Sequence, residues 1–377
     1  MKIKVVSLTV VLVTCLLMGV MGPCLSDDAD AKYQQIVTDG LGNELELDRV
    51  PSKIVTIGAG FTATAIDMGL LDKIIVADKY SYSNADKVFD GLREKVDAGE
   101  IRASGSAYSS GLSDVLTDIW TMSEKYGLVE NNVVDDVAVF ITGSEANVKS
   151  LYKDLTESRI KYKYVLCWGN VSSYNDIVGM VETMSLVMNG KLNDMAKQMS
   201  SVVEHIDKVL SDVPNLKARE AFFVTFSGGV LKVGNDGSLA NSMILAAGGD
   251  SITMDSTKAS TYETNITKLL EDYGTDVVIF IDNSIASTPS NMDVLTKALA
   301  GQEVKIVKLD PLWNNFCNRS MDGVWAMACA MYPDLFSGEV PTVEDERDDN
   351  VGIYVAVGVI GASIVAVLAF MFLRSKS

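Results

Sequence analysis

Short apolar runs alternate with helix-like stretches along most of this chain. Runs the length of one strand lie at 53–58, 73–77, 136–141 and 162–167. They lack the apolar–polar alternation of a half-exposed strand, and such runs are typical of strands buried on both faces. With helical segments between them, they predict an α/β fold with a mainly parallel sheet. An alternating segment at 36–47 predicts a small hairpin before them.

The same alternation returns after Pro214. Strands are predicted at 221–226, 228–233, 276–281 and 304–309, and helices at 239–247 and 322–332. Between the two regions, apolar residues recur every three or four positions, which indicates helix, and Asn189-Gly190 interrupts that pattern. We therefore predict two α/β lobes, at 33–173 and 214–337, joined by a long rigid helix over 174–213.

Both ends of the sequence are apolar and free of charge. Residues 5–26 follow Lys2 and Lys4, a layout typical of a secretory signal, so we predict a signal peptide over 1–26. An uncleaved N-terminal span and a lipid anchor at Cys24 stay open as alternatives. The run 351–373 holds 23 uncharged residues. At ~1.5 Å per residue a helix of this length crosses the ~30 Å hydrocarbon layer with some tilt. We predict one transmembrane helix there.

Charges beside these segments predict the orientation. Arg374 and Lys376 follow the predicted span, and positive residues favour the cytoplasmic side of a membrane. The stretch 338–350, with its run of acids, is typical of a solvated tether. The expected protein is held in the cell membrane by a single span, with its main body extracellular and its C-terminus cytoplasmic.

Composition agrees with an extracellular body and excludes one class of partner. The 377 residues carry 50 Asp and Glu against 32 Lys and Arg, a formal charge of −18, yet the mean hydropathy is +0.19. The apolar excess lies in the two ends. A nucleic-acid-binding protein needs basic surface to meet phosphates, so the acidity argues against that function.

One glycine motif suggests a dinucleotide site. Gly58-Ala59-Gly60 follows a predicted strand and opens a helix, and Asp78 ends the next strand. That arrangement suits a pyrophosphate at a helix N-terminus. A nicotinamide cofactor is not normally available outside the cell, so we favour a tight strand-to-helix turn whose glycines line another kind of site.

Catalytic groups are few. His205 is the only histidine, which excludes histidine-rich metal sites and leaves one residue for any catalytic triad. It falls within the helical stretch, where a structural role is expected. No CxxC pair or P-loop occurs. The sequence indicates a protein that is not an enzyme.

The cysteines and glycosylation motifs leave several options open. Outside the predicted signal, the thiols allow either a bridge between Cys317 and Cys329 or free buried groups. Three Asn-x-Ser/Thr sequons begin at Asn170, Asn265 and Asn318. Such triplets often arise by chance, so they carry little weight.

Several motifs occur in an order that resembles a known family. Segments 37–47 and 50–58 resemble the start of iron-complex and cobalamin substrate-binding proteins of ABC importers. Met68-Gly69-Leu70 resembles the end of that family's first helix. Gly248-Gly249, Thr275-Asp276 and Tyr332-Pro333-Asp334 continue the likeness to about residue 336. The order of these motifs is more specific than any one of them.

The resemblance implies a function. Members capture a metal chelate (a ferric siderophore, a cobalamin-like corrinoid or haem) between two lobes bridged by a helix. They hand it to a permease that a cytoplasmic ATPase drives. The chelate is the transported ligand, and no cofactor is implied. A transmembrane tether raises the concentration of such a binder at its permease, and it indicates a cell with one membrane, as in archaea.

The resemblance also implies contact residues. Tyr80 corresponds to an aromatic residue in a cleft loop of the first lobe, and Phe226 begins a cleft loop of the second. Trp313 and Arg319 correspond to an aromatic residue and an arginine in the last cleft loop. Aromatic side chains suit flat or bulky chelates, and an arginine suits their carboxylates or phosphates. The expected ligand-binding residues are Gly60, Phe61, Tyr80, Trp168, Phe226, Trp313 and Arg319.

Members dock on the permease through one acid per lobe. Asp114 falls at the position expected for the first lobe. The second-lobe position is Thr267, and the nearest acid is Glu263, four residues earlier, which puts that contact in doubt.

Two other hypotheses stay open. An extracytoplasmic enzyme or cofactor-binding protein could use the Gly58/Gly60 turn and Asp78. A surface sensor or adhesion protein could use the same fold without transport. Neighbouring genes for a permease and an ATPase would favour the import hypothesis over both.

Overall fold

The computed structural model describes residues 35–81, 89, 91–109, 111–313 and 315–341. The chain divides before Gln35, and all described residues lie in the unit that begins there. The predicted signal peptide (1–26), the predicted transmembrane helix (351–373) and residues 342–350 of the predicted tether lie outside the described residues. Within the described ranges, no helix combines the length and apolar character that crossing a membrane requires.

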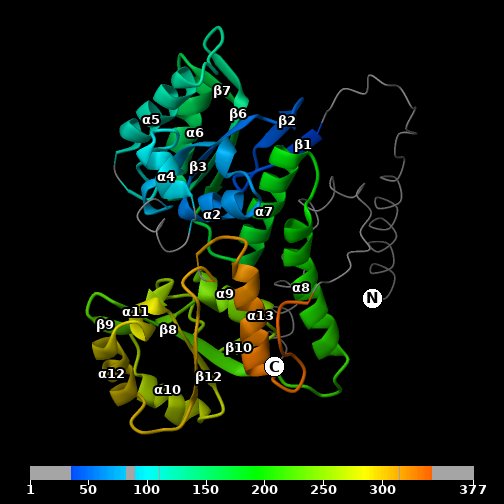
Figure 1. Ribbon diagram of the computed structural model, residues 1–377. Helices are drawn as coiled ribbons and strands as arrows, with labels where there is room; N and C mark the ends of the chain where they lie inside the picture. Colours follow the sequence, from blue (N-terminus) through cyan, green and yellow to red (C-terminus); the bar gives the residue numbers. More distant parts are fainter. Residues whose placement is uncertain (1–34, 82–88, 90, 110, 314, 342–377) are drawn as a thin grey trace, which may run out of the picture. The chain divides into compact units, whose positions relative to one another are not determined.

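The first sheet has five strands, all parallel to their neighbours. They are β3 (Lys53–Ile57), β4 (Ile74–Asp78), β5 (Arg102–Ser104), β6 (Val133–Gly143) and β7 (Lys161–Gly169). Their order across the sheet is β5-β4-β3-β6-β7; Figure 1 labels β3, β6 and β7 of this sheet. The predicted parallel sheet is confirmed. The short polar strand β5 has no apolar run and was not predicted.

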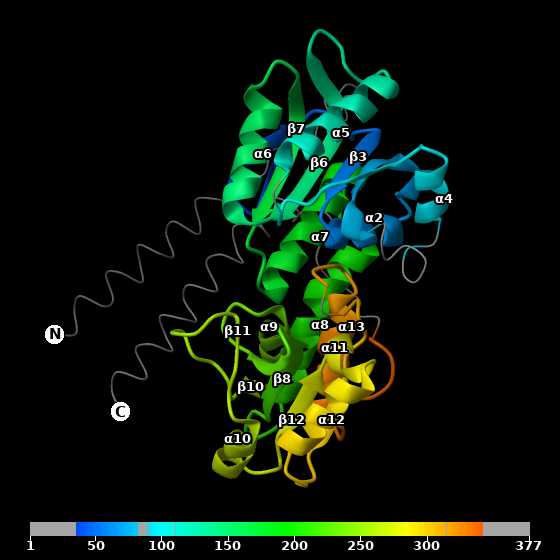
Figure 2. The same cartoon turned by 90° about the vertical axis from the view of Figure 1, so that its left-hand side faces the viewer.

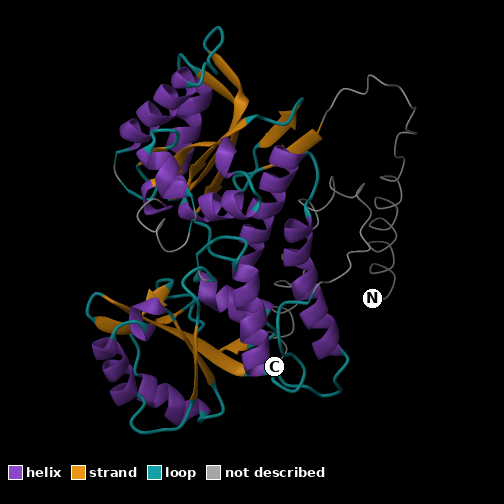
Figure 3. Cartoon of the chain, in the orientation of Figure 1, coloured by secondary structure: helices purple, strands orange, loops and turns teal. Residues whose placement is uncertain are grey.

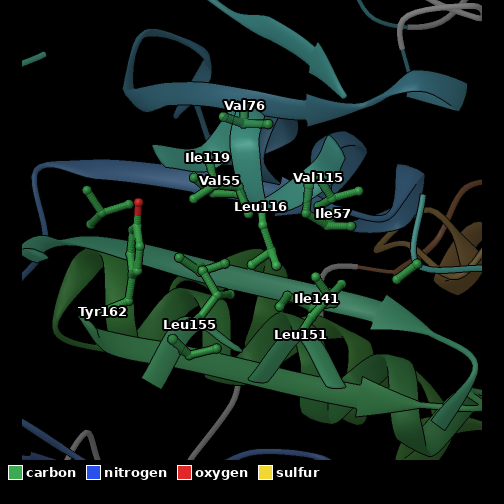
Figure 4. Close-up of a cluster of buried hydrophobic side chains, with 14 of the residues drawn as sticks. Val55, Ile57, Val76, Val115, Leu116, Ile119, Ile141, Leu151, Leu155 and Tyr162 are labelled. Carbon is green, nitrogen blue, oxygen red and sulfur yellow. The ribbon is translucent and has the colours of Figure 1, made fainter. Parts of the chain in front are cut away.

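Helices cover both faces of this sheet, which is why its strands are continuously apolar. Val55 and Ile57 of β3 pack with Val115 of α5 (Leu112–Lys125) and Leu151 of α6 (Glu145–Glu157) on one face (Figure 4). Phe140 of β6 points the other way, toward α2 (Ala59–Asp67). A short 3-10 turn η1 (Leu71–Lys73) and α4 (Leu92–Asp97) flank β4 in sequence.

The second sheet is mixed. Its strands are β8 (Glu220–Ser227), β9 (Val230–Gly234), β10 (Asp250–Ser251), β11 (Thr261–Tyr262), β12 (Val278–Ile281) and β13 (Lys305–Lys308). Strands β8, β12 and β13 are parallel, whereas β9 returns antiparallel beside β8. The longer predicted strands are confirmed. The two-residue strands β10 and β11 were not predicted.

Helices also cover the second sheet. Apolar residues of α10 (Ile266–Tyr273), α11 (Asn283–Ala286) and α12 (Pro289–Ala298) pack with Phe222 and Ile279 of the sheet. Two further helices, α9 (Leu239–Ala246) and α13 (Ser320–Met331), contact each other, and α9 also contacts β8. Helices and strands alternate along most of the chain, as the sequence pattern predicted, and Figure 3 shows helices beside the strands of both sheets.

The predicted hairpin is confirmed as β1 (Gln35–Thr38) and β2 (Glu44–Leu47). Asp39 holds its turn, because the carboxylate accepts hydrogen bonds from the amides of Leu41 (3.0 Å) and Asn43 (2.9 Å). It also accepts one from the Cys167 amide on β7, at 3.0 Å. The hairpin is thereby tied to the first sheet.

The predicted single linking helix is wrong. Residues 174–213 form two helices, α7 (Tyr174–Asn189) and α8 (Asp194–Ser211), which pack against each other (Figure 2). Gly190 ends α7 with a φ of 74°, a conformation that glycine adopts at little cost. Asn193 caps α8, and the Ser185 hydroxyl accepts a bond from the Asn193 amide at 2.8 Å. The Asn189-Gly190 interruption therefore marks a turn.

Candidate functional site

Two exposed tyrosines lie at the carboxyl edge of the first sheet. Tyr80 follows β4 and Tyr108 follows β5, its neighbour in the sheet, and each is 50% exposed. The Tyr108 hydroxyl lies 3.3 Å from that of Thr142 near the end of β6, and the Lys79 ammonium lies 5.2 Å from the Tyr80 ring centre. Ligands of open α/β sheets favour this edge. The pair offers aromatic surface and phenol groups to a ligand.

Tyr80 was expected from sequence and Tyr108 was missed. Tyr108 follows the strand β5, which has no apolar run, so the pattern did not show that a strand ends there. An aromatic residue three to five positions after a strand of a parallel sheet is the signal that would have found it, once β5 was known.

Asp78 supports the loop that carries Tyr80. Its carboxylate is 1% exposed and accepts a hydrogen bond from the Tyr80 amide at 2.7 Å. Burial raises the pKa of Asp78, and bonds from the Tyr80 amide and the Ser106 hydroxyl partly offset that effect. This carboxylate is directed to the loops that follow β4 and β5 and does not present itself to a ribose.

The Gly58-Gly60 turn is filled by another part of the chain. Gly58 has a φ of 139°, and a Cβ there would overlap the Thr142 side chain. A Cβ on Gly60 would overlap the carbonyl oxygen of Phe316. That carbonyl occupies the space beside the first turn of α2 which a pyrophosphate would need. The geometry thus favours the tight-turn interpretation over the dinucleotide site.

Phe61 and Trp168 lie in the core. Phe61 is 1% exposed and Trp168 is 5% exposed, with ring centres 5.3 Å apart. The Trp168 ring also packs over Gly40, where a Cβ would collide with it. These two expected ligand contacts leave little surface for a ligand.

Phe226 and Trp313 lie near strand ends of the second sheet. Phe226 is the penultimate residue of β8 and half-buried, and its amide donates to the Ser284 hydroxyl at 2.9 Å. Trp313 follows β13, is half-buried, and packs on Gly323 of α13, where a Cβ would lie 2.8 Å from the Trp313 Cβ. Both keep part of the side chain accessible, as a ligand contact requires.

Arg319 already has a carboxylate partner. Its Nε and Nη2 atoms donate to the two oxygens of Asp67 at 2.8 Å each, and the Asn318 side-chain amide donates to Asp67 at 2.8 Å. Burial alone would raise the pKa of Asp67, but the bonds from Arg319 and Asn318 outweigh it and lower that pKa. An anionic ligand group that approached Arg319 would therefore compete with a carboxylate that already accepts from Nε and Nη2.

The two expected docking acids are exposed, and they lie on elements that flank different sheets. Asp114 lies in the first turn of α5, and Glu263 lies between β11 and α10. Thr267, which stands at the position where the resemblance expects an acid, donates its hydroxyl to the Ala298 carbonyl at 2.6 Å. It links α10 to the end of α12.

The histidine and the three cysteines of the described residues are all at least partly buried. His205 on α8 is half-buried, with its ring centre 6.1 Å from that of Trp325. Cys167, Cys317 and Cys329 are free thiols, so the bridge between Cys317 and Cys329 does not form. Burial raises the pKa of the Cys317 thiol to about 12, which keeps it protonated and unreactive.

A shallow depression lies beside the ends of β6 and β7. It is lined by Ser144, Glu145, Ala146, Lys149 and Asn170. Lys149 pairs with Glu145 one turn away on α6. This pairing satisfies both charges within the helix.

No family model and no curated protein sequence matches the chain. Solved structures do. CeuE of Helicobacter pylori in a nickel–histidine complex has a TM-score of 0.55 at 14% identity, over 80% of this chain and 89% of that one. A periplasmic haem-binding protein of Pseudomonas aeruginosa has a TM-score of 0.51 at 15% identity, over 79% and 99% of the two chains.

A third solved structure is also similar to this chain. The periplasmic vitamin B12 binding protein BtuF of Vibrio cholerae has a TM-score of 0.50 at 13% identity, over 75% of this chain and 98% of that one. The fold is similar to that of all three structures, which confirms an α/β fold of the periplasmic binding protein kind and leaves the single linking helix unconfirmed. At this identity the likeness shows the fold alone.

Proposed function

We propose that this protein is the solute-binding component of an ABC importer for a metal chelate, a ferric siderophore, a corrinoid or haem. The observation that carries the proposal is the carboxyl edge of the first sheet. There Tyr80 and Tyr108, each 50% exposed, present aromatic surface on a fold used by periplasmic binding proteins. Phe226 and Trp313 would face the same ligand from the second sheet.

The chemistry of these residues supports capture without catalysis. Phenol and indole rings bind flat or bulky chelates through apolar contact and hydrogen bonds. Asp78 accepts hydrogen bonds from the loops after β4 and β5, and Arg319 pairs with Asp67, so neither is set up as an acid, a base or an electrophile. The chelate is then cargo, and the partners are a permease, which Asp114 and Glu263 would contact, and its ATPase.

Binding of defined chelates tests the proposal. The full-length chain, purified with detergent present, is titrated with cyanocobalamin, haem, a ferric hydroxamate and the nickel–histidine complex. Tryptophan quenching and calorimetry report binding. We expect at least one dissociation constant below about 10 μM, or about −6.8 kcal/mol. If none is tighter than about 100 μM, the proposal is wrong.

We further propose that the protein is anchored in the cell membrane through 351–373, with its body outside the cell after removal of 1–26. The apolar, uncharged character of both segments supports this. In intact cells, added protease should digest the body of the full-length protein, and the chain truncated after residue 350 should appear in the medium. A body that stays protected until the cells are lysed would contradict the proposed location.

A further inference from the structure

One segment of the second half lies along a helix of the first. Residues 315–319 lie between β13 and α13, while α2 follows β3 of the first sheet. The carbonyl of Phe316 packs on Gly60. One turn later, the Asn318 amide donates to the Thr64 hydroxyl at 3.3 Å. The contact ends at the last residue of α2, Asp67. The segment thus follows α2 from its first turn to its end.

The end of this contact is the most strongly bonded part. Asp67 accepts three hydrogen bonds of 2.8 Å, two from the guanidinium of Arg319 and one from Asn318. A planar guanidinium that bonds both oxygens of a carboxylate fixes orientation as well as distance. The side chains of Asp67 and Arg319 are only 20% and 35% exposed. We call these contacts of Asp67 with Asn318 and Arg319 the latch.

The backbone conformation of the rest of segment 315–319 depends on contacts with other parts of the chain. Phe316 has a φ of 49°, in the left-handed region that a bulky residue seldom adopts without tertiary contacts. The buried Cys317 thiol lies 3.4 Å from the Leu312 carbonyl, which links the segment to the end of the preceding loop. Trp313, an expected ligand contact, lies in that same loop. A change in the latch therefore acts on the loop that carries Trp313.

We propose that Asp67 is a positioning residue, which fastens segment 315–319 to α2 and so sets the spacing of the two carboxyl edges before a ligand arrives. The expected effect of Asp67 on ligand binding rests on the proposed function. The contact of Asp67 with Asn318 and Arg319 does not depend on that function. Asp322 also lies close enough to Arg319 to help raise the pKa of Arg319, and Asp310 in turn helps raise the pKa of Asp322. The Nε and Nη2 atoms of Arg319 nevertheless donate to Asp67.

Hydrogen exchange of the full-length chain tests the latch. Asp67→Asn removes the charge and keeps the shape. The matched control is Asp276→Asn, because Asp276 also bonds a guanidinium with both oxygens, that of Arg219 at 2.7 and 3.1 Å, within the second half. Amides of 315–320 should exchange at least about tenfold faster in Asp67→Asn. In Asp276→Asn they should stay within about twofold of the wild type. Equal rates in the two variants would overturn the proposal.

Two more variants separate positioning from folding. Should Asp67→Asn lose protection throughout both sheets, Arg319→Lys takes its place, since lysine keeps the charge and loses the two-pronged geometry. Arg319→Lys should speed amide hydrogen exchange in residues 315–320 alone. Unchanged exchange in these residues would contradict the proposed role of the latch. The double variant Asp67→Arg with Arg319→Asp should restore protection that each single change removes, and no recovery would count against a direct pair.

Ligand kinetics then connect the latch to binding. For a chelate that binds the wild type, Asp67→Asn should slow association by about threefold to tenfold, because fewer molecules hold the competent spacing. Asp276→Asn should leave the rate unchanged. An unaltered association rate in Asp67→Asn would remove the link to binding. If no chelate binds at all, the proposed function fails, while the exchange result still decides the latch.

Discussion

Tyr80 and Tyr108 each expose half of their surface at neighbouring strand ends, although buried strands lie beneath them. Half of the surface of each residue is not used in packing and is accessible to a ligand. Each should therefore add more to ligand binding than to stability. Phe61 and Trp168 show the opposite balance: they were expected from sequence to touch a ligand, and they stabilise the core instead.

Alanine at either exposed tyrosine should weaken binding of a confirmed chelate by about tenfold, or about 1.4 kcal/mol. Tyr273→Ala is the control, because Tyr273 at the end of α10 is 45% exposed and belongs to another surface. Calorimetric titration measures the affinity, and thermal unfolding should be alike in all three variants. Equal affinities for the three would remove both tyrosines from the site.

At the scale of elements, α2 and α7 each contain a glycine, and the two glycines have different surroundings. Gly60 near the start of α2 has a neighbouring backbone where a Cβ would stand, whereas Gly179 in the middle of α7 has open space there. Alanine favours a helix over glycine by about 1 kcal/mol when nothing else changes. The same substitution should consequently have opposite effects at the two positions.

Gly179→Ala should raise the free energy of unfolding by about 0.5 to 1 kcal/mol. Gly60→Ala should lower it by about 2 kcal/mol or more, because the Phe316 carbonyl is backbone and cannot move aside alone. Urea unfolding of both variants measures the two signs. A stabilised Gly60→Ala variant would mean that segment 315–319 does not pack on α2 as described.

The sequence predicts elements well where a pattern is local. Buried strands show as apolar runs, the hairpin as an alternation around a turn, and the boundary of α7 as Asn189-Gly190. Contacts between distant residues leave no such mark. Asp67 and Arg319 are 252 positions apart, and nothing near either one shows that they pair. The sequence accordingly suggests a free arginine for a ligand where the fold has an ion pair.

At the scale of the whole molecule, the latch links stability to pH. The pKa of Asp67 is lowered from its usual value of 3.8 in the folded protein. A carboxyl group with a lowered pKa stabilises the fold above its unfolded pKa, and that contribution is lost as the pH falls through the folded value. Asp78, whose burial raises its pKa, has the opposite sign and favours the fold at low pH.

Asp67→Asn should therefore cost about 1 to 2 kcal/mol at pH 7, allowing for solvent at the partly exposed Arg319. The cost should shrink as the pH falls below 3.8, and vanish once the wild-type carboxyl is protonated. Urea midpoints of both proteins between pH 7 and the acid limit of folding measure the difference. A difference that stays constant with pH would show that Asp67 acts through its shape and not its charge.

Segment 315–319 limits which of the three sequons can carry a glycan in the folded protein. Asn318 begins a sequon, yet its side chain is 6% exposed and its amide nitrogen is bonded to Asp67. A glycan attached to that nitrogen before folding would hold the segment away from α2. Asn170 and Asn265 are exposed, and the Asn265 cap uses its oxygen, which leaves the nitrogen available. A glycosylating cell would make native protein only from nascent chains that fold before Asn318 is modified.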